Sequence, residues 1–433
     1  MEYSIVGYLA FACLIVLITI GVPIAWAITL VAFVGTSYIF GIEQATTQFY
    51  TTAFNTGSEF LFASIPLFIL MGQVVSKARI GEDLYQAMYR WFGRLPGGLA
   101  VTSVASCAAF GAVTGVSSAA VGTMARMVMP EMKRYGYDLR LATGSLASAA
   151  TIAIMIPPSL LMVLYGLWTE TSIGKLFIAG IVPGLLTTAI FSLYIMIRCK
   201  LNPALGPVGP RFSWRERWAS LGQLMPIGVI FFVVIGGMYS GFFTPGEAAA
   251  IGAGATVLVA MALRRLTLAA FIEAAADTAA LSVMIFAVLV SASVLSRFFV
   301  GTQVTTSIIE AIGDSGLNRY VILLLLIVMY LILGCVLDAF GMILLTLPFV
   351  FPIVVQLGFD AVWFGVLLTF LTEIALITPP VGFNVYILSK IVPDVPMHQI
   401  FRGAFPFVGL ALLVILLITI FPQLVLWLPN RMI

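Results

Sequence analysis

The sequence is a succession of long apolar runs separated by short polar breaks. The runs cover residues 4–20, 24–40, 60–76, 98–130, 138–168, 175–197, 224–240, 246–263, 278–298, 319–355, 361–391 and 403–428. A helix needs about 20 apolar residues to cross the hydrocarbon core of a membrane, and spanning helices satisfy their own backbone hydrogen bonds there. Since 61% of the 433 residues are hydrophobic and 9% are charged, the pattern predicts an all-α polytopic membrane protein.

The other composition features exclude several functions. The formal net charge of +3 is too small and too scattered for nucleic-acid binding. The four cysteines lie far apart without CxxC spacing, and the sole histidine, His398, has no HExxH motif around it. No P-loop is present, so we expect no ATP hydrolysis by this chain. Because the sequence shows none of these catalytic motifs, we do not expect an enzyme. The first apolar run lacks a preceding Lys or Arg, so we interpret it as a transmembrane helix and not a cleaved signal.

Two of the apolar runs are too long for one crossing and are interrupted near the middle. Residues 98–134 contain GAVTGVSSAAVG, and residues 319–356 contain GCVLDAFG. The first arm of the earlier run measures about 24 Å at 1.5 Å per residue, which is short of the hydrocarbon core of about 30 Å. Each run is therefore predicted to be a re-entrant helical hairpin.

An internal repeat relates the two halves of the sequence. Shifting by 222 positions superimposes Pro130 on Pro352, the Gly-x-Asp at 136–138 on that at 358–360, and Pro157–Pro158 on Pro379–Pro380. A double proline and a Gly-x-Asp on one diagonal are not expected by chance. We therefore predict two structural repeats, each with about five crossings and one hairpin, and the odd number of crossings inverts the second repeat.

The repeat divides the chain into two halves and a linker. We predict these ranges: 1–205 for repeat 1, with hairpin 98–134 and broken helix 138–168; 206–223 for a cytoplasmic linker; 224–433 for repeat 2, with hairpin 319–356 and broken helix 360–391. The positive-inside rule leaves most of the 21 Lys and Arg residues inside when both termini are outside. Inverted repeats with broken helices are typical of secondary transporters, which bind their cargo near the midplane. Two amphipathic stretches, 77–98 and 264–279, are predicted to be interfacial helices.

The double prolines predict cation sites. Pro158 and Pro380 lack an N–H and disrupt the preceding turn. The freed carbonyls belong to Ala153 and Ile156 in the first repeat and to Ala375 and Thr378 in the second. At membrane depth such carbonyls need protein, water or a cation, and a sodium ion fits. A simple proline kink is the alternative.

The hairpin tips are predicted to complete these sites. Gly115, Ser117 and Ser118 offer close backbone approach and hydroxyl oxygens, and Asp338 and Gly341 have the corresponding places in the second repeat. Close helix packing by small residues is the alternative for the first tip. Asp338 and Glu373 are carboxylates within the hydrocarbon, where burial of charge is costly and usually functional, although Glu373 could pair with a neighbouring helix. Arg126 and Arg297 could either snorkel or contact substrate.

The sequence resembles the large membrane subunit of the tripartite ATP-independent periplasmic (TRAP) transporters over essentially its whole length. The matching motifs are GVPIAWA (21–27), FGAVTGVSSAAVGTM (110–124), PEMKRYGYD (130–138), IPPSLLMVLYG (156–166), IAGIVPG (178–184), YSGFFTPGEAAAIGA (239–253) and TPPVGFNVYILS (378–389). The resemblance implies an elevator mechanism driven by sodium in a bacterial inner membrane. It also implies a small four-helix membrane subunit, expected here as a separate chain, and a periplasmic substrate-binding protein.

The same resemblance implies a carboxylate cargo, such as a dicarboxylate or sialic acid, and no cofactor besides the coupling sodium. We expect five residues of the tip and proline segments to contact it: Thr114, Ser118, Ser159, Gly382 and Asn384. The alternative function is a sodium-coupled carboxylate or citrate-type carrier that needs no binding protein. Neighbouring genes for a secreted binding protein and a four-span protein would favour the first function. An ion channel would need a continuous polar stripe, and the sequence has none.

Overall fold

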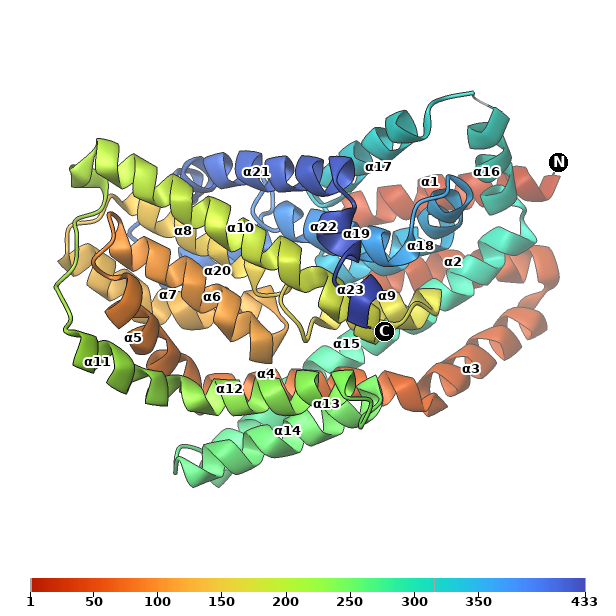
Figure 1. Cartoon of the computed structure of the whole chain (residues 1–433). Coiled ribbons are helices and arrows are strands. Elements are labelled where there is room, and N and C mark those ends of the chain that lie inside the picture. Colours follow the sequence, from red (N-terminus) through yellow and green to blue (C-terminus); the bar gives the residue numbers. More distant parts are fainter. Residues whose placement is uncertain (1, 315, 433) are drawn as a thin grey trace.

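The computed structural model describes residues 2–314 and 316–432, and every regular element in these ranges is a helix (Figure 1). The predicted all-α class is therefore confirmed. Seven helices are long and apolar enough to cross a membrane. They are Phe60–Lys77, Ile173–Leu201, Trp214–Tyr239, Pro245–Ala262, Leu268–Gly301, Ala339–Gln356 and Met397–Ile420. The predicted domain limits at residues 1 and 433 lie outside the described residues.

The helices of the first half follow the apolar runs closely. In order they are α1 (Glu2–Thr19), α2 (Ile24–Phe40), α3 (Ile42–Ser58), η1 (Phe60–Ala63), α4 (Ser64–Lys77), α5 (Ile80–Phe92), α6 (Gly98–Thr114), α7 (Ser117–Arg134), α8 (Leu139–Ile152), α9 (Leu160–Thr169) and α10 (Ile173–Leu201), with a short η2 (Pro203–Leu205). Helices α6 and α7 pack against each other as a helical hairpin. A break of seven residues separates α8 from α9.

Part of this order recurs in the second half. Its helices are α11 (Trp214–Ser220), η3 (Leu221–Leu224), α12 (Met225–Phe231), η4 (Phe232–Gly236), α13 (Gly237–Tyr239), α14 (Pro245–Ala262), α15 (Leu268–Gly301), α16 (Val304–Asp314), α17 (Arg319–Leu333), α18 (Ala339–Gln356), α19 (Ala361–Ala375), α20 (Phe383–Ile391), α21 (Met397–Ile420), α22 (Gln423–Leu426) and α23 (Pro429–Met432). Helices α7 and α18 each have 18 residues. Their first residues, like those of α8 and α19, lie 222 positions apart.

The duplicated Gly-x-Asp motif connects each hairpin to the broken helix that follows it. Gly136 and Gly358 adopt φ values of 71° and 73° directly after α7 and α18, a conformation that glycine adopts without a steric penalty. Two residues later, Asp138 accepts a hydrogen bond from the Leu141 N–H at 2.8 Å. Asp360 accepts one from the Val362 N–H at 2.8 Å. The motif therefore ends one helix and caps the next in both halves.

One expectation about the polar segments is wrong. Residues 264–279 do not form a separate interfacial helix, because they belong mostly to α15, which is continuous over 34 residues from Leu268 to Gly301. No proline or glycine interrupts this stretch before Gly301, so nothing ends the helix. The range 206–223, predicted as a linker, contains α11, and the helix α3 falls where no apolar run was expected. The other stretch, 77–98, does contain a separate amphipathic helix, α5.

The core lies around the two broken helices. From Leu141 to Ile152 every residue of α8 is buried, and so is every residue of α19 from Trp363 to Ala375. In Figure 1 the hairpin α6–α7 and helix α8 lie in the left half of the molecule, while α17–α18 and α19 lie in the right half. Helices α10 and α21 pack along the outside of this core. The breaks and hairpin tips therefore meet inside the molecule.

Candidate functional site

The tip of the first hairpin packs directly against the first break. Gly115 ends α6 with φ 60°, and its carbonyl oxygen accepts a hydrogen bond from the Leu160 N–H at 3.4 Å. A Cβ added to Gly115 would overlap the carbonyl oxygen of Pro158, and one added to Gly111 would overlap that of Ala153. The fold thus brings together three predicted sodium-site residues, Gly115, Ala153 and Pro158. Only glycine permits this approach of two backbones.

The first break leaves backbone oxygens without donors. Helix α8 ends at Ile152, and Ser159 caps α9 by accepting from the Met162 N–H at 3.3 Å. Among the described residues, no backbone or side-chain group donates to the carbonyl oxygens of Ala153 and Ile156. Both residues are buried. The predicted free carbonyls are therefore present at the first break.

A buried carboxylate from the second half faces the first tip. The Ser117 hydroxyl donates to Oε1 of Glu373 at 3.2 Å, although the two residues are 256 positions apart. Glu373 is fully buried, and its Oε2 has no hydrogen-bond partner among the described residues. Our predicted site omitted Glu373, although a carboxylate inside a membrane is a recognisable signal. Ser118, the neighbour of Ser117, is only half-buried.

The Asn384 side chain is also buried without a hydrogen-bond partner among the described residues. Its side chain is fully buried, and neither Oδ1 nor Nδ2 has a hydrogen-bond partner in the described part of the chain. Its backbone N–H donates to the Leu376 carbonyl across the second break at 3.0 Å. Helix α20, which begins one residue before Asn384, packs against α7 and α8. A buried amide of this kind costs free energy unless a ligand or an ion satisfies it.

The second tip meets the second break through Gly334 and Cys335, which were not among the predicted site residues. A Cβ on Gly334 would overlap the Cβ of Ala375, and the Cys335 thiol donates to the Pro379 carbonyl at 3.2 Å. Asp338 precedes α18 and is half-buried. A Cβ added to Gly341 would lie 2.8 Å from Oδ1 of Asp338. The predicted pair of Asp338 and Gly341 is thus adjacent at the start of α18.

One predicted free carbonyl is not free. The oxygen of Ala375 accepts from both the backbone N–H and the hydroxyl of Thr378, at 3.3 and 3.0 Å. The turn that follows α19 forms these bonds itself, so the proline does not expose this oxygen. The Thr378 carbonyl receives no donor among the described residues. Pro380 is exposed, whereas Pro158 is buried.

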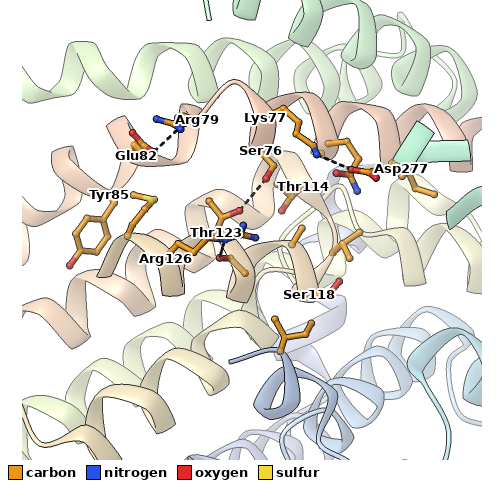
Figure 2. A pocket seen from close by; sticks show the side chains of 18 of the residues that line it. Ser76, Lys77, Arg79, Glu82, Tyr85, Thr114, Ser118, Thr123, Arg126 and Asp277 are labelled. Atoms are coloured by element: carbon orange, nitrogen blue, oxygen red, sulfur yellow. Dashed lines mark hydrogen bonds and ion pairs between the residues drawn. The ribbon is translucent and has the colours of Figure 1, made fainter. Parts of the chain in front are cut away.

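A cavity of about 950 Å³ lies beside the first tip. Its wall comes from α4, α5, α6, α7, α15 and α20, and Figure 2 shows its polar side chains. Of the predicted substrate contacts, Thr114 and Ser118 line it. Ser159, Gly382 and Asn384 are not among its lining residues, although Phe383 is. The five predicted contacts therefore do not form one surface.

Ion pairs surround this cavity. Lys77 lies 2.5 Å from Glu273 and 3.0 Å from Asp277 of α15. Arg79 lies 3.8 Å from Glu82 on α5. The hydroxyls of Ser76 and Thr123 are hydrogen-bonded at 3.2 Å, and Figure 2 shows this bond beside the two groups of charges. From the sequence, these charges are predicted only to belong to two interfacial helices. The contact between α4 and α15 that pairs them cannot be inferred from either segment alone.

The arrangement places oxygen atoms that could bind a cation next to a polar cavity. Free carbonyls of the first break, the Ser117 hydroxyl and the Glu373 carboxylate belong to segments that meet around the first tip. Such hard oxygen donors suit an alkali cation, and a carboxylate compensates its charge. The cavity next to Ser118 is large enough for a small organic molecule.

A solved structure gives the class of the fold. The chain matches the crystal structure of the Alcanivorax borkumensis YdaH transporter with a TM-score of 0.61 at 15% identity. The match covers 88% of this chain and 90% of that one. The two chains therefore share one helical fold.

The sequence comparisons give the family. The model of the tripartite ATP-independent periplasmic transporter, DctM component, matches residues 11–424, so the chain belongs to this family of large TRAP permeases. It is 34% identical to the C4-dicarboxylate TRAP transporter large permease protein DctM of Pseudomonas aeruginosa, over 87% of this chain and 88% of that protein. It is 32% identical to the ectoine/5-hydroxyectoine permease UehC of Ruegeria pomeroyi, over 97% and 98%. It is 29% identical to the sialic acid permease SiaM of Vibrio cholerae, over 99% and 98%. The resemblance noted in the sequence is confirmed.

Proposed function

We propose that this permease carries out sodium-coupled secondary active uptake of an organic acid. The observation that carries this proposal is the Ser117–Glu373 contact, in which a fully buried carboxylate keeps one oxygen unpartnered beside the first tip, as far as the described residues go. A bound sodium ion would satisfy that oxygen together with the free carbonyls of Ala153 and Ile156. The names of the relatives, which include C4-dicarboxylates and sialic acid, support an organic acid as cargo.

We infer that sodium, and not a proton, is the coupling ion. Proton-driven transporters use chains of Asp, Glu and His within the membrane. Here the groups around the first tip are mostly neutral oxygens with one carboxylate, a set that suits a metal cation of low charge. The second tip, with Asp338 and the free Thr378 carbonyl, offers a second site of similar chemistry.

Transport by an elevator movement of inverted repeats is part of the proposal. The helix order recurs with a spacing of 222 residues, and the two hairpins occupy opposite halves of the molecule (Figure 1). Two related hairpins approaching from opposite membrane faces would support alternating access around one central site. In this mechanism the hairpins and broken helices would move together past the remaining helices.

The complete transporter would contain three proteins. We propose a separate small membrane subunit of four helices and a periplasmic binding protein that delivers the organic acid. The complex would lie in a bacterial inner membrane with both termini of this chain periplasmic, because that orientation puts most Lys and Arg residues in the cytoplasm.

Uptake into proteoliposomes tests the coupling. The protein, reconstituted with a small membrane subunit and a periplasmic binding protein of this transporter family, is assayed with succinate, sialic acid and ectoine. We expect uptake of one of these only with an inward sodium gradient and the binding protein. Equal uptake from a proton gradient in sodium-free medium would contradict sodium coupling. Uptake without the binding protein would instead favour the stand-alone carboxylate carrier.

Cysteine labelling tests the inverted topology separately. Single cysteines in the Pro130–Asp138 loop should react only with reagent applied from the cytoplasm, and those in the Pro352–Asp360 loop only from the periplasm. Labelling of both loops from the same side would remove the inverted repeat from the proposal, whatever the coupling ion.

A further inference from the structure

One cation in the cavity forms no ion pair among the described residues. Arg126 of α7 lines the cavity, and its Nε donates to the Gly122 carbonyl at 3.1 Å. The other two lining cations, Lys77 and Arg79, form ion pairs with carboxylates. Within residues 2–314 and 316–432, Arg126 forms none, although Glu131 lines the same cavity five residues further along α7. The guanidinium therefore remains available to an anion.

The position of Arg126 follows from the sequence of α7. Ser118, Gly122 and Arg126 are spaced by four residues and so lie on one face of the helix. Because Gly122 has no side chain, the Arg126 side chain lies back along the helix, where a Cβ on Gly122 would be 3.6 Å from its Nη2. The hydrogen bond from Nε holds the side chain and leaves the Nη1 and Nη2 groups for a partner. Figure 2 shows Arg126 beside Thr123, on the helix that carries Ser118.

We propose that Arg126 is an anion-binding residue of the cavity, which holds a carboxylate of the cargo about one helical turn from the first tip. The proposal rests on the proposed function and adds a second contact point to it. Arg126 follows Ser118 by eight residues, but its guanidinium lies beside Gly122, which is four residues or about 6 Å along the helix from Ser118. A carboxylate bound to this guanidinium therefore lies about one helical turn from the first tip. A guanidinium is suited to this role because its planar donors match a carboxylate.

The chemistry of the site favours transient binding. The cavity is open and polar, and Arg126 itself is exposed. In such a place water weakens a single ion pair to a small fraction of its strength in a dry interior. A carboxylate is thus attracted into the cavity and released from it quickly. Lys77 is paired with two carboxylates and Arg79 with one, so neither of these cations is free to bind the cargo.

The reactivity of an introduced thiol measures the electrostatic effect of the Arg126 guanidinium without requiring transport. Thr123, one turn before Arg126, lines the same cavity, and the Thr123→Cys substitution is made in a protein whose Cys13 and Cys335 are changed to Ser. The rates of reaction with a negatively charged and a positively charged methanethiosulfonate are compared. Arg126→Gln should lower the ratio of the negative-reagent rate to the positive-reagent rate roughly fivefold. Arg126→Lys, which keeps the charge, should leave the ratio near its original value.

A matched control separates Arg126 from the other charges. The double variant Arg79→Gln/Glu82→Gln removes a cation together with its carboxylate, so it should leave the ratio unchanged. Succinate should slow the labelling of the introduced thiol when position 126 is Arg or Lys and not when it is Gln, while neutral succinamide should have no effect. An unchanged ratio in Arg126→Gln, or protection by succinate without the cation, would overturn the proposal.

The outcome is independent of the coupling mechanism. If no tested acid is transported but the ratio and the protection behave as expected, the anion site stands and the proposed cargo fails. If Arg126→Gln takes up the cargo at the original rate over all concentrations, the site has no part in transport and this inference fails, while the proposed function stands. Size-exclusion profiles of the variants exclude misfolding as the cause.

Discussion

The two hairpin tips have equivalent positions in the repeat but different surroundings. At the first break Pro157 and Pro158 are buried, whereas at the second Pro379 and Pro380 are exposed. The first tip contacts its break through glycine and backbone, and the second through Gly334 and Cys335. The same double proline therefore lies in a buried break in the first half and in an exposed break in the second half.

The difference arises from what each tip meets in the other half. Ser117 reaches Glu373, which directly precedes the second break. The position equivalent to Glu373 in the first half is Thr151, which uses its hydroxyl to bond the Ser148 carbonyl of its own helix. A buried carboxylate from the end of the opposite broken helix therefore reaches only the first tip. The two halves are therefore alike in the order of hairpin and broken helix, and they differ in the charge at the end of α8 and α19.

Gly115→Ala should have the largest effect on stability. The substitution forces φ 60° on alanine, at about 1–2 kcal/mol, and overlaps the Pro158 carbonyl, at about 1–3 kcal/mol more. Gly136→Ala is the matched control, since it has φ 71° but nothing within 4 Å. Thermal unfolding in detergent should show a larger loss for Gly115→Ala. Equal losses would mean that the first tip and break are not in tight contact.

Glu373→Gln should have the largest effect on sodium dependence. The amide still accepts a hydrogen bond from Ser117 but no longer compensates a cation, and we expect about a hundredfold loss of apparent sodium affinity, or about 2.7 kcal/mol. Asp338→Asn, at the half-buried second tip, should cost about thirtyfold. Uptake at limiting sodium measures both. A larger effect for Asp338→Asn would reverse the comparison between the buried and the exposed break.

Ser118→Ala should lower the apparent sodium affinity about tenfold, or about 1.4 kcal/mol, with little change in packing volume. Ser117→Ala should cost at least as much, because it removes the only hydrogen-bond partner of the Glu373 side chain found in the described residues. If both variants keep the original sodium dependence, the serines only permit close helix approach, and the cation site lies elsewhere.

Asp394→Asn should have the smallest effect. Lys133, at the end of α7, donates to both carboxylate oxygens of Asp394 at 2.7 Å, and this hydrogen bond holds the pKa of Asp394 below its usual value. The position equivalent to Lys133 in the second hairpin is Val355, so only the first hairpin has this tie.

A carboxyl group with a lowered pKa stabilises the folded state above its unfolded pKa of about 3.9 and loses that contribution as the pH falls through the folded pKa. The apparent melting temperature of Asp394→Asn should therefore fall by no more than about 2 °C at pH 7. It should converge with that of the original protein in acid. A difference that grows as the pH falls would have the wrong sign.

Several features were predictable because neighbouring residues produce them. The composition predicted helices, and the glycine-rich interruptions predicted where α6 gives way to α7 and α17 to α18. The prolines at 157–158 and 379–380 predicted the breaks. The free carbonyl of Ala153 follows from the missing N–H of Pro157 four residues later. The Ile156 oxygen is free because the N–H of Leu160, four residues later, bonds Gly115 of the hairpin tip, and at Ala375 a nearby threonine bonds the oxygen instead. Local backbone chemistry thus decides where the helices end, and side chains can alter which groups stay free.

The sequence alone therefore predicted a membrane protein made of helices, the motifs that recur at a spacing of 222 residues, and the positions of both tips and breaks. Only the tertiary structure decided that Glu373 meets Ser117, that Asn384 is buried without a partner in the described part of the chain, and that Arg126 is the unpaired cation of the cavity there. The physical reason is range. Helix formation and helix ends depend on bonds between residues a few positions apart, whereas burial and charge compensation depend on segments more than 200 positions apart that meet only when the two halves pack together.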